Sequence, residues 1–221
     1  MLKLGIDEAG RGPVIGPLVI AGCLLTEETE KELKKLGVKD SKKLTAKKRE
    51  ELDKAIREKA ETFEIMIIPP LEIEDQNKRG ILLNELEAMA AARIINKINK
   101  GFGEMQVVID CPNPNTENWR LLVLSAIKNK SNIHLSCEHK ADVNHVSASA
   151  ASVLAKVMRD KEIACLKEQF GEIGSGYCHD PVTMKFIEQN LRKYEYSGIF
   201  RKTWATWKNA VAKMNQRQLE F

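Results

Sequence analysis

The sequence predicts an α/β protein built around a mixed sheet, and two observations support this prediction. Residues 2–6 and 17–25 are apolar runs on either side of a segment rich in glycine and proline, which is the pattern of a hairpin. Further along, short apolar runs at 105–109 and 133–137 alternate with segments of helical periodicity. Strands that first cluster and then alternate with helices indicate a sheet with both antiparallel and parallel neighbours.

Apolar residues at helical spacing predict the remaining elements in order. The expected helices cover residues 27–36, 46–61, 81–100, 117–128, 147–170 and 182–194. Thr26 and Thr45 precede the first two helices and carry the side-chain oxygen that caps a first turn. Residues 63–68 are predicted to form a strand that stops at Pro69, whereas the polar residues 72–80 are predicted to be irregular. The tail beyond Trp207 is expected to fray.

The composition is that of a globular protein, with 43% hydrophobic and 30% charged residues. No apolar run approaches the roughly 20 residues that cross a bilayer, and acids at Asp7 and Glu8 do not fit a secretory signal, so a cytoplasmic location is expected. The five cysteines are scattered and odd in number, which favours reduced thiols over a disulfide framework or a zinc site. The net charge of +4 points only weakly to an anionic partner.

Four acids stand out by their positions in the sequence. Asp7 and Glu8 end the first strand, Asp110 ends a later one, and Asp142 lies between a strand and the longest helix. Strand ends are where sites assemble in open α/β sheets, and carboxylate oxygens are the ligands that Mg²⁺ prefers. Strand alternation sends Asp7 and Glu8 to opposite faces. The alternative, that each acid is a helix cap or an ion-pair partner, stays equally open from the residues alone.

Basic residues accompany these acids and suit a substrate that carries phosphates. They are Arg11, Lys42, Lys43, Lys140, Lys156 and Arg159. Tyr177 follows a glycine-rich loop and is a candidate for stacking on a base or a sugar, although a lone tyrosine more often fills a core or a rim.

A series of short motifs also runs through nearly the whole chain. It consists of Gly5-Ile6-Asp7-Glu8-Ala9-Gly10-Arg11-Gly12, Gly16-Pro17-Leu18, Asp40-Ser41-Lys42-Lys43-Leu44, Asp110 after an apolar strand, His139-Lys140-Ala141-Asp142, Ser149-Ala150-Ala151-Ser152, Gly174-Ser175-Gly176-Tyr177 and Trp207-Lys208. In this order the motifs resemble those of type 2 ribonuclease H (ribonuclease HII), and the archaeal branch most. A lone Asp-Glu pair would be a weak signal, whereas this ordered set is highly specific.

The resemblance implies a ribonuclease H-like catalytic domain over residues 1–170, with a mixed five-stranded sheet flanked by helices. It also implies a helical C-terminal extension over 171–221 that packs on this domain and contributes to substrate binding. The implied activity is endonucleolytic cleavage of the RNA strand in RNA–DNA hybrids, and of single ribonucleotides embedded in duplex DNA, giving a 3′-hydroxyl and a 5′-phosphate. Two divalent ions, Mg²⁺ or Mn²⁺, would take part. The expected roles are ribonucleotide excision and RNA primer removal, by a monomer for which a replication clamp is a candidate partner.

The resemblance also assigns residues. Asp7, Glu8, Asp110 and Asp142 would be the catalytic metal ligands. The implied substrate-binding residues are Gly10, Arg11, Gly12, Ser41, Lys42, Lys43, Lys140 and Tyr177. The Gly-Arg-Gly turn would recognise the 2′-hydroxyl and the adjacent phosphate of the ribonucleotide, and Tyr177 would pack on the neighbouring deoxyribose.

The sequence departs from the family at Val143-Asn144-His145-Val146, which lacks an expected Tyr-Pro, and at Cys178-His179, which replaces smaller residues. Both departures concern the expected substrate-binding residues more than the four acids. Two other interpretations remain: another ribonuclease H-like nuclease such as a junction resolvase, and a non-catalytic hybrid-binding protein. The first would not need the Gly-Arg-Gly turn together with Tyr177, and the second could lose an acid.

Overall fold

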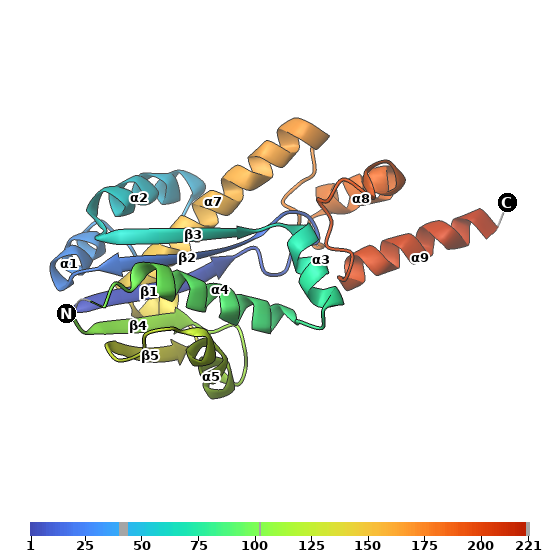
Figure 1. Cartoon of the computed structure of the whole chain (residues 1–221). Helices are drawn as coiled ribbons and strands as arrows, with labels where there is room; N and C mark the ends of the chain where they lie inside the picture. Colours follow the sequence, from blue (N-terminus) through green and yellow to red (C-terminus); the bar gives the residue numbers. More distant parts are fainter. Residues whose placement is uncertain (40–43, 102, 220–221) are drawn as a thin grey trace. The chain divides into compact units, whose positions relative to one another are not determined.

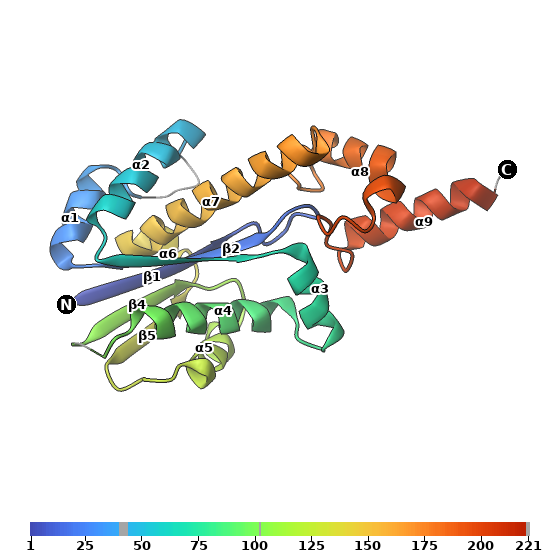
Figure 2. The same cartoon turned by 45° about the horizontal axis from the view of Figure 1, so that its top comes forward.

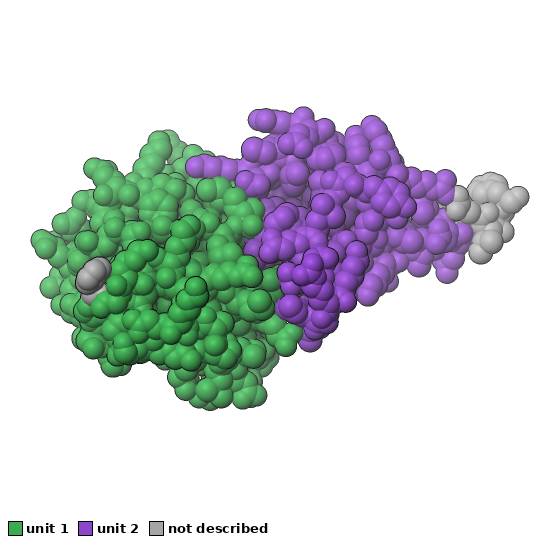
Figure 3. Space-filling model, viewed as in Figure 1, with its two compact units in different colours: residues 1–9, 19–67, 83–158 green, residues 10–18, 68–82, 159–221 purple. Residues whose placement is uncertain are grey.

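The computed structural model describes residues 1–39, 44–101 and 103–219 (Figure 1). The chain divides into two compact units (Figure 3). Unit 1 contains residues 1–9, 19–67 and 83–158, and unit 2 contains residues 10–18, 68–82 and 159–221. The domain boundary expected at residue 170 therefore falls within unit 2. Among the described residues, no helix is long and apolar enough to cross a membrane.

The described part of the chain forms a five-stranded sheet in the order β3-β2-β1-β4-β5. The strands are β1 (Leu2–Ala9), β2 (Leu18–Leu25), β3 (Thr62–Ile68), β4 (Met105–Asp110) and β5 (Ile133–Glu138). Strand β1 pairs antiparallel with β2 and parallel with β4, and β4 pairs parallel with β5. The predicted mixed sheet and its first hairpin are therefore confirmed.

Helices cover both faces of this sheet. Those of unit 1 are α1 (Glu27–Lys35), α2 (Ala46–Lys59), α4 (Leu83–Ile98), α5 (Thr116–Ala126), the short α6 (Ala141–Asn144) and the first half of α7 (Val146–Phe170). Helices α1, α2 and α7 lie on one face, and α4 and α5 on the other (Figure 2). Thr26 and Thr45 cap α1 and α2 as predicted, because their side chains accept hydrogen bonds from the N–H groups of Thr29 and Lys48.

The close approach of α7 to β1 depends on Gly5. A Cβ atom at this position would lie only 2.0 Å from the backbone of Ser147 and Ala148 in α7, so no other residue fits there. Because side chains alternate along a strand, Gly5 and Asp7 share the face covered by α7. Glu8 points to the opposite face, as strand alternation predicts. The packing of α7 on β1 thus decides which side chains surround Asp7.

Two predictions about secondary structure are wrong. Residues 72–80, predicted to be irregular, largely belong to α3 (Pro70–Lys78) in unit 2. Pro70 is at the start of this helix, where a missing N–H leaves no helical hydrogen bond unmade, so the Pro69-Pro70 pair that stops β3 also begins α3. Residues 208–219, expected to fray, belong to α9 (Ala205–Leu219), where the buried Trp207 ring lies 4.6 Å from that of Phe200.

Unit 2 has its own hydrophobic core. It is formed by the 10–18 segment together with α8 (Pro181–Tyr194) and α9, and its largest buried side chains include Phe186, Phe200 and Trp207. A backbone bridge joins Ile15 to Phe200. The connection between the first two strands is thus built into the C-terminal part of the chain.

Candidate active site

Three of the four predicted acids meet at one point of unit 1. Asp7 lies near the end of β1, Asp110 is the last residue of β4, and Asp142 lies in α6. One carboxylate oxygen from each lies within 4.8 Å of the others. Strands β1 and β4 are parallel neighbours, with Ile6 opposite Ile109, so their carboxyl ends reach the same edge of the sheet. Pairing of the strands thus places the first two acids together.

The third acid is brought to this edge by a sharp change of chain direction after β5. Lys140 adopts a left-handed backbone with φ of 60°, which is uncommon for a residue other than glycine. The following N–H group, that of Ala141, donates a 2.8 Å hydrogen bond to the carboxylate of Asp110. Asp142 comes next and is fully buried. The strained residue and the hydrogen bond together hold Asp142 against the end of β4.

The electrostatics of Asp7 are those of a crowded and buried carboxylate. Its side chain is only 4% exposed. Burial, and secondarily the charge of Asp110, raise the pKa of Asp7 to about 7. Hydrogen bonds from the Ser152 hydroxyl and the Glu8 N–H, and the charge of Lys156, act in the opposite direction. Lys156 also donates to the Ser152 hydroxyl at 3.1 Å, so α7 supplies two linked groups that favour the ionised form of Asp7.

This arrangement fits a divalent cation. Burial is the main cause of the raised pKa of Asp7, and the nearby charge of Asp110 adds to it. A positive charge between the three carboxylate oxygens would favour their ionised forms. Hard cations such as Mg²⁺ and Mn²⁺ bind carboxylate oxygens. The three carboxylates therefore form a donor set that suits a divalent ion.

Glu8, the fourth predicted acid, lies outside this group of three oxygens. It is half-buried on the other face of β1, and its charge acts on Cys111, the residue after Asp110. Burial raises the pKa of the Cys111 thiol, and the charges of Glu8, Asp110 and Glu87 raise it further. The assignment of Glu8 as a metal ligand stays a prediction.

The predicted substrate-binding turn lies in unit 2. Gly10 has a φ of 80°, and a Cβ atom there would lie 2.6 Å from the Arg159 side chain and 2.7 Å from the carbonyl oxygen of Pro17. Gly12 differs, because it is exposed and a Cβ atom would meet only a carbon of Tyr177, at an ordinary 3.7 Å. The fold therefore requires glycine at position 10, whereas it leaves room for a side chain at position 12.

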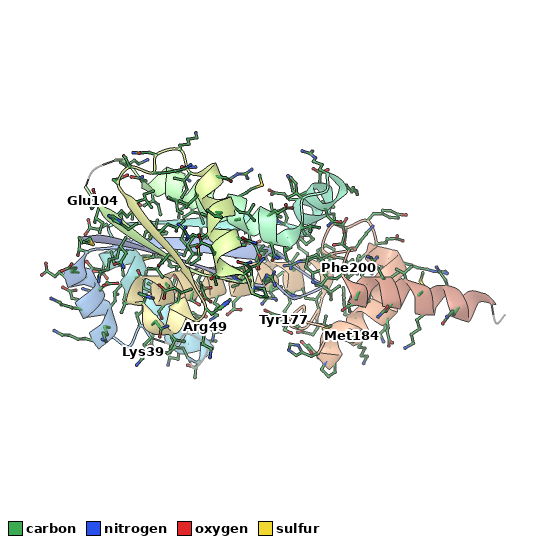
Figure 4. All side chains as sticks on the ribbon, turned by 90° about the horizontal axis from the view of Figure 1, so that it is seen from below. Lys39, Arg49, Glu104, Tyr177, Met184 and Phe200 are labelled. Atoms are coloured by element: carbon green, nitrogen blue, oxygen red, sulfur yellow. The ribbon has the colours of Figure 1, made fainter. Side chains whose placement is uncertain are left out.

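Tyr177 lies beside this turn, in the loop between α7 and α8 (Figure 4). The Arg159 guanidinium stacks over its ring at 4.8 Å and donates to the carbonyl oxygen of Ser175 at 2.8 Å. The carbonyl of Gly176 accepts hydrogen bonds from the N–H groups of Val14 and Ile15, at 2.8 and 3.2 Å. Unit 2 thus joins two motifs that are more than 150 residues apart, the turn and the tyrosine.

The other predicted contacts are less well defined. Ser41, Lys42 and Lys43 lie outside the described residues. The side chain of Lys140 is exposed, and its backbone has the left-handed conformation that turns the chain after β5. Two residues that the sequence did not indicate, Arg201 and Trp204, bind the carbonyls of the turn.

Comparisons with known proteins identify similar sequences and similar folds. The family model of Ribonuclease HII matches residues 4–207. Ribonuclease HII of Thermococcus sibiricus is 41% identical over 219 residues, which are 98% of this chain and 95% of that protein. The crystal structure of ribonuclease H2 from Pyrococcus horikoshii OT3 has a TM-score of 0.86 at 35% identity, over 97% of this chain and 99% of that one. The PCNA:RNase HII complex from Archaeoglobus fulgidus contains a similar chain, with a TM-score of 0.81, 36% identity and coverage of 92% and 95%. The predicted ribonuclease H-like fold is confirmed.

Proposed function

The chain belongs to the ribonuclease HII family, whose members cleave RNA in RNA–DNA hybrids and ribonucleotides in DNA, and from this premise we propose how its residues divide the work. Asp7, Asp110 and Asp142 form the catalytic centre, joined by Glu8 from the neighbouring position on β1. The single observation that supports this centre is the convergence of three carboxylate oxygens within 4.8 Å at the end of two parallel strands.

The cofactor in this proposal is a pair of divalent ions, Mg²⁺ or Mn²⁺. When bound, such ions would make water more acidic and stabilise the charge on the oxygen that attacks phosphorus and on the 3′-oxygen that leaves. The chain's own part is to hold the acids in place. The Ala141 N–H fixes one oxygen of Asp110, and Ser152 with Lys156 keeps Asp7 ready to ionise. The products are a 3′-hydroxyl and a 5′-phosphate.

Substrate recognition is assigned to the turn and the tyrosine of unit 2. We propose that Gly10, Arg11 and Gly12 bind the ribonucleotide through its 2′-hydroxyl and the adjacent phosphate, and that Tyr177 packs on the next deoxyribose. The exposed Gly12, where the fold itself leaves room for a side chain, supports this role, since only a ligand would then require glycine. The helical C-terminal residues 171–221 contribute further substrate contacts, as do Lys140 and the segment Ser41–Lys43.

A sliding clamp is the proposed protein partner, since the similar Archaeoglobus chain occurs in a complex with PCNA. We further propose that the enzyme acts as a monomer in the cytoplasm, in ribonucleotide excision and in removal of RNA primers.

The test of this function uses three duplexes of one sequence: a continuous RNA–DNA hybrid, a DNA duplex with a single ribonucleotide, and an all-DNA control. The wild type with Mg²⁺ is expected to cut the first two and to leave the third intact. Asp7→Asn is expected to lose cleavage while it still binds the hybrid in a gel-shift assay. Near-normal turnover by Asp7→Asn would remove this residue from the centre, and cleavage of the all-DNA control would contradict the ribonucleotide specificity.

A further inference from the structure

Arg201 is a fully buried residue whose guanidinium is directed at the backbone of the turn. Its Nη2 donates to the carbonyl oxygen of Gly10 at 2.6 Å, its Nη1 to that of Arg11 at 2.8 Å, and its Nε to that of Gly16 at 3.0 Å. The backbone N–H of Arg201 also donates to Val14 at 2.8 Å. One residue therefore binds four carbonyl groups of the seven-residue stretch 10–16.

Trp204 completes this set of contacts. Its indole Nε1 donates to the carbonyl oxygen of Gly12 at 3.2 Å, and its ring lies 5.0 Å from the Arg201 guanidinium. The backbone N–H of Trp204 donates to the carbonyl of Arg201 at 3.1 Å, which fixes the two side chains relative to each other. The carbonyls of Gly10, Arg11 and Gly12 are thus all bound by a single short segment before α9.

These contacts also determine where the N–H groups of the turn point. A trans peptide is planar, and its C=O and N–H groups point in opposite directions. No described peptide bond is cis. Because the carbonyls of Gly10 and Arg11 point at the guanidinium, the N–H groups of Arg11 and Gly12 point away from it. Those are the backbone donors of the turn that a 2′-oxygen or a phosphate oxygen would meet.

We propose that Arg201, supported by Trp204, is a positioning residue that sets how strongly the enzyme distinguishes a ribose from a sugar lacking the 2′-hydroxyl. This inference rests on the function proposed above for the turn. In this proposal Arg201 acts through the orientation of the two peptide groups whose carbonyls it binds, those of Gly10 and Arg11. Arginine suits this task because its planar fork presents several donors in fixed directions, whereas lysine offers one ammonium group on a flexible stem.

The experiment compares two duplexes that differ at one position, which carries either a ribonucleotide or its 2′-fluoro analogue. The measured quantity is the ratio of the initial cleavage rates on these two substrates. A misplaced donor costs the ribonucleotide substrate its contacts to both the 2′-hydroxyl and the phosphate, where about 1 Å can cost roughly 100-fold. The fluoro substrate loses only the phosphate contact, so its slow cleavage falls much less. The ratio for Arg201→Met is therefore expected to fall at least about 10-fold, and that for Arg201→Lys to be intermediate. Arg192→Met, the same substitution at an exposed arginine of α8, is expected to keep the wild-type ratio.

The outcomes separate positioning from stability. A variant that is only less stable loses folded enzyme, so both rates would fall in proportion, the ratio would stay constant, and the inference would be overturned. Should Arg201→Met fail to fold, Trp204→Phe provides the test, because it keeps an aromatic ring near the Arg201 guanidinium and removes the donor to Gly12. A ratio reduced about three-fold or more is expected for it, and an unchanged ratio would overturn the inference. A wild type that cuts both substrates equally would instead contradict the function proposed for the turn.

Discussion

The hydroxyl of Ser152 hydrogen-bonds to the carboxylate of Asp7, and so opposes the burial and the neighbouring charge of Asp110 that raise the pKa of Asp7 to about 7. The same hydroxyl accepts a hydrogen bond from Lys156. Side chains of α7 therefore partly offset the burial and the charge that raise the pKa of Asp7. Removing this hydroxyl tests that relationship.

Ser152→Ala is expected to raise the pKa of Asp7 further, because the lost hydrogen bond favours the ionised form. Protons then compete more strongly with the metal. At pH 7 the apparent affinity for Mg²⁺ should fall by about 10-fold, since a hydrogen bond to a charged group is worth about 1.5–3 kcal/mol. At pH 9, where Asp7 ionises in both proteins, the difference should shrink. Calorimetric titration at the two pH values measures this, with Ser125→Ala on the exposed side of α5 as control. An equal loss at both pH values would contradict the electrostatic explanation.

Asp7→Asn is expected to stabilise the protein when a chelator removes all metal. The folded protein holds the Asp7 proton up to about pH 7, whereas the unfolded chain releases it near the ordinary value of 3.8. The folded state thus binds more protons between these values, so wild-type stability falls as the pH rises from about 4 to about 7. The variant lacks this loss, and at pH 8 its free energy of unfolding should exceed the wild-type value by on the order of 3 kcal/mol.

Urea unfolding in EDTA at pH 4.5 and pH 8 measures that difference, which should be small at the lower pH. Addition of Mg²⁺ should then raise the stability of the wild type and leave the variant nearly unchanged. Asp75→Asn, at an exposed ion pair with Arg79, provides the control. If the variant were less stable than the wild type at pH 8, the prediction would be contradicted. The ionised Asp7 carboxylate would then make stabilising interactions that asparagine cannot make.

The two glycines of the turn should respond differently to alanine. Gly10→Ala places a Cβ atom 2.6 Å from Arg159 in a left-handed backbone and should destabilise the protein by about 1–3 kcal/mol. Gly12→Ala meets nothing closer than 3.7 Å, so its stability should change by less than about 0.5 kcal/mol. Its cleavage of an embedded ribonucleotide should nevertheless fall roughly 100-fold. Thermal unfolding together with initial rates distinguishes the two variants. Full activity of Gly12→Ala would mean that the substrate does not approach this residue.

Tyr177 should act through the face of its ring. Tyr177→Phe keeps the ring over Arg159 and should cost little activity. Tyr177→Ala should lose cleavage of the single-ribonucleotide substrate by roughly 10- to 100-fold, because stacking on a nucleic acid is worth about 1–3 kcal/mol. The continuous hybrid should be affected less. The check is the rate on both substrates for both variants. Equal damage by both variants would assign the effect to the hydroxyl group.

Much of this arrangement follows from local patterns in the sequence. Alternation along β1 correctly separates Asp7 from Glu8, and apolar runs that end at Asp7 and Asp110 correctly predict acids at strand ends. The glycine spacing around Arg11 correctly marks a turn. These features depend on neighbouring residues, which a sequence pattern can reveal.

What the sequence did not reveal depends on residues far apart in the chain. Arg201 lies 190 residues from Arg11, and nothing near it marks it as a partner of that turn. The same holds for Trp204 and Gly12. Helix α3 was missed for a local reason, because Pro70 was interpreted only as the end of a strand and not as the start of a helix.

The division of unit 2 into three stretches of sequence has a consequence for protein synthesis. The stretch 10–18 leaves the ribosome early, whereas Arg201, which binds its carbonyls, follows about 190 residues later. At about 5–20 residues per second this interval lasts on the order of 10–40 s. Asp142, the last of the three clustered acids, precedes Arg201 by only 59 residues, so the acids are complete about 3–12 s before the residue that binds the turn. A nascent chain that ends before residue 201 lacks the groups that bind the carbonyls of Gly10 and Arg11, so the turn can take its final form only near the end of synthesis.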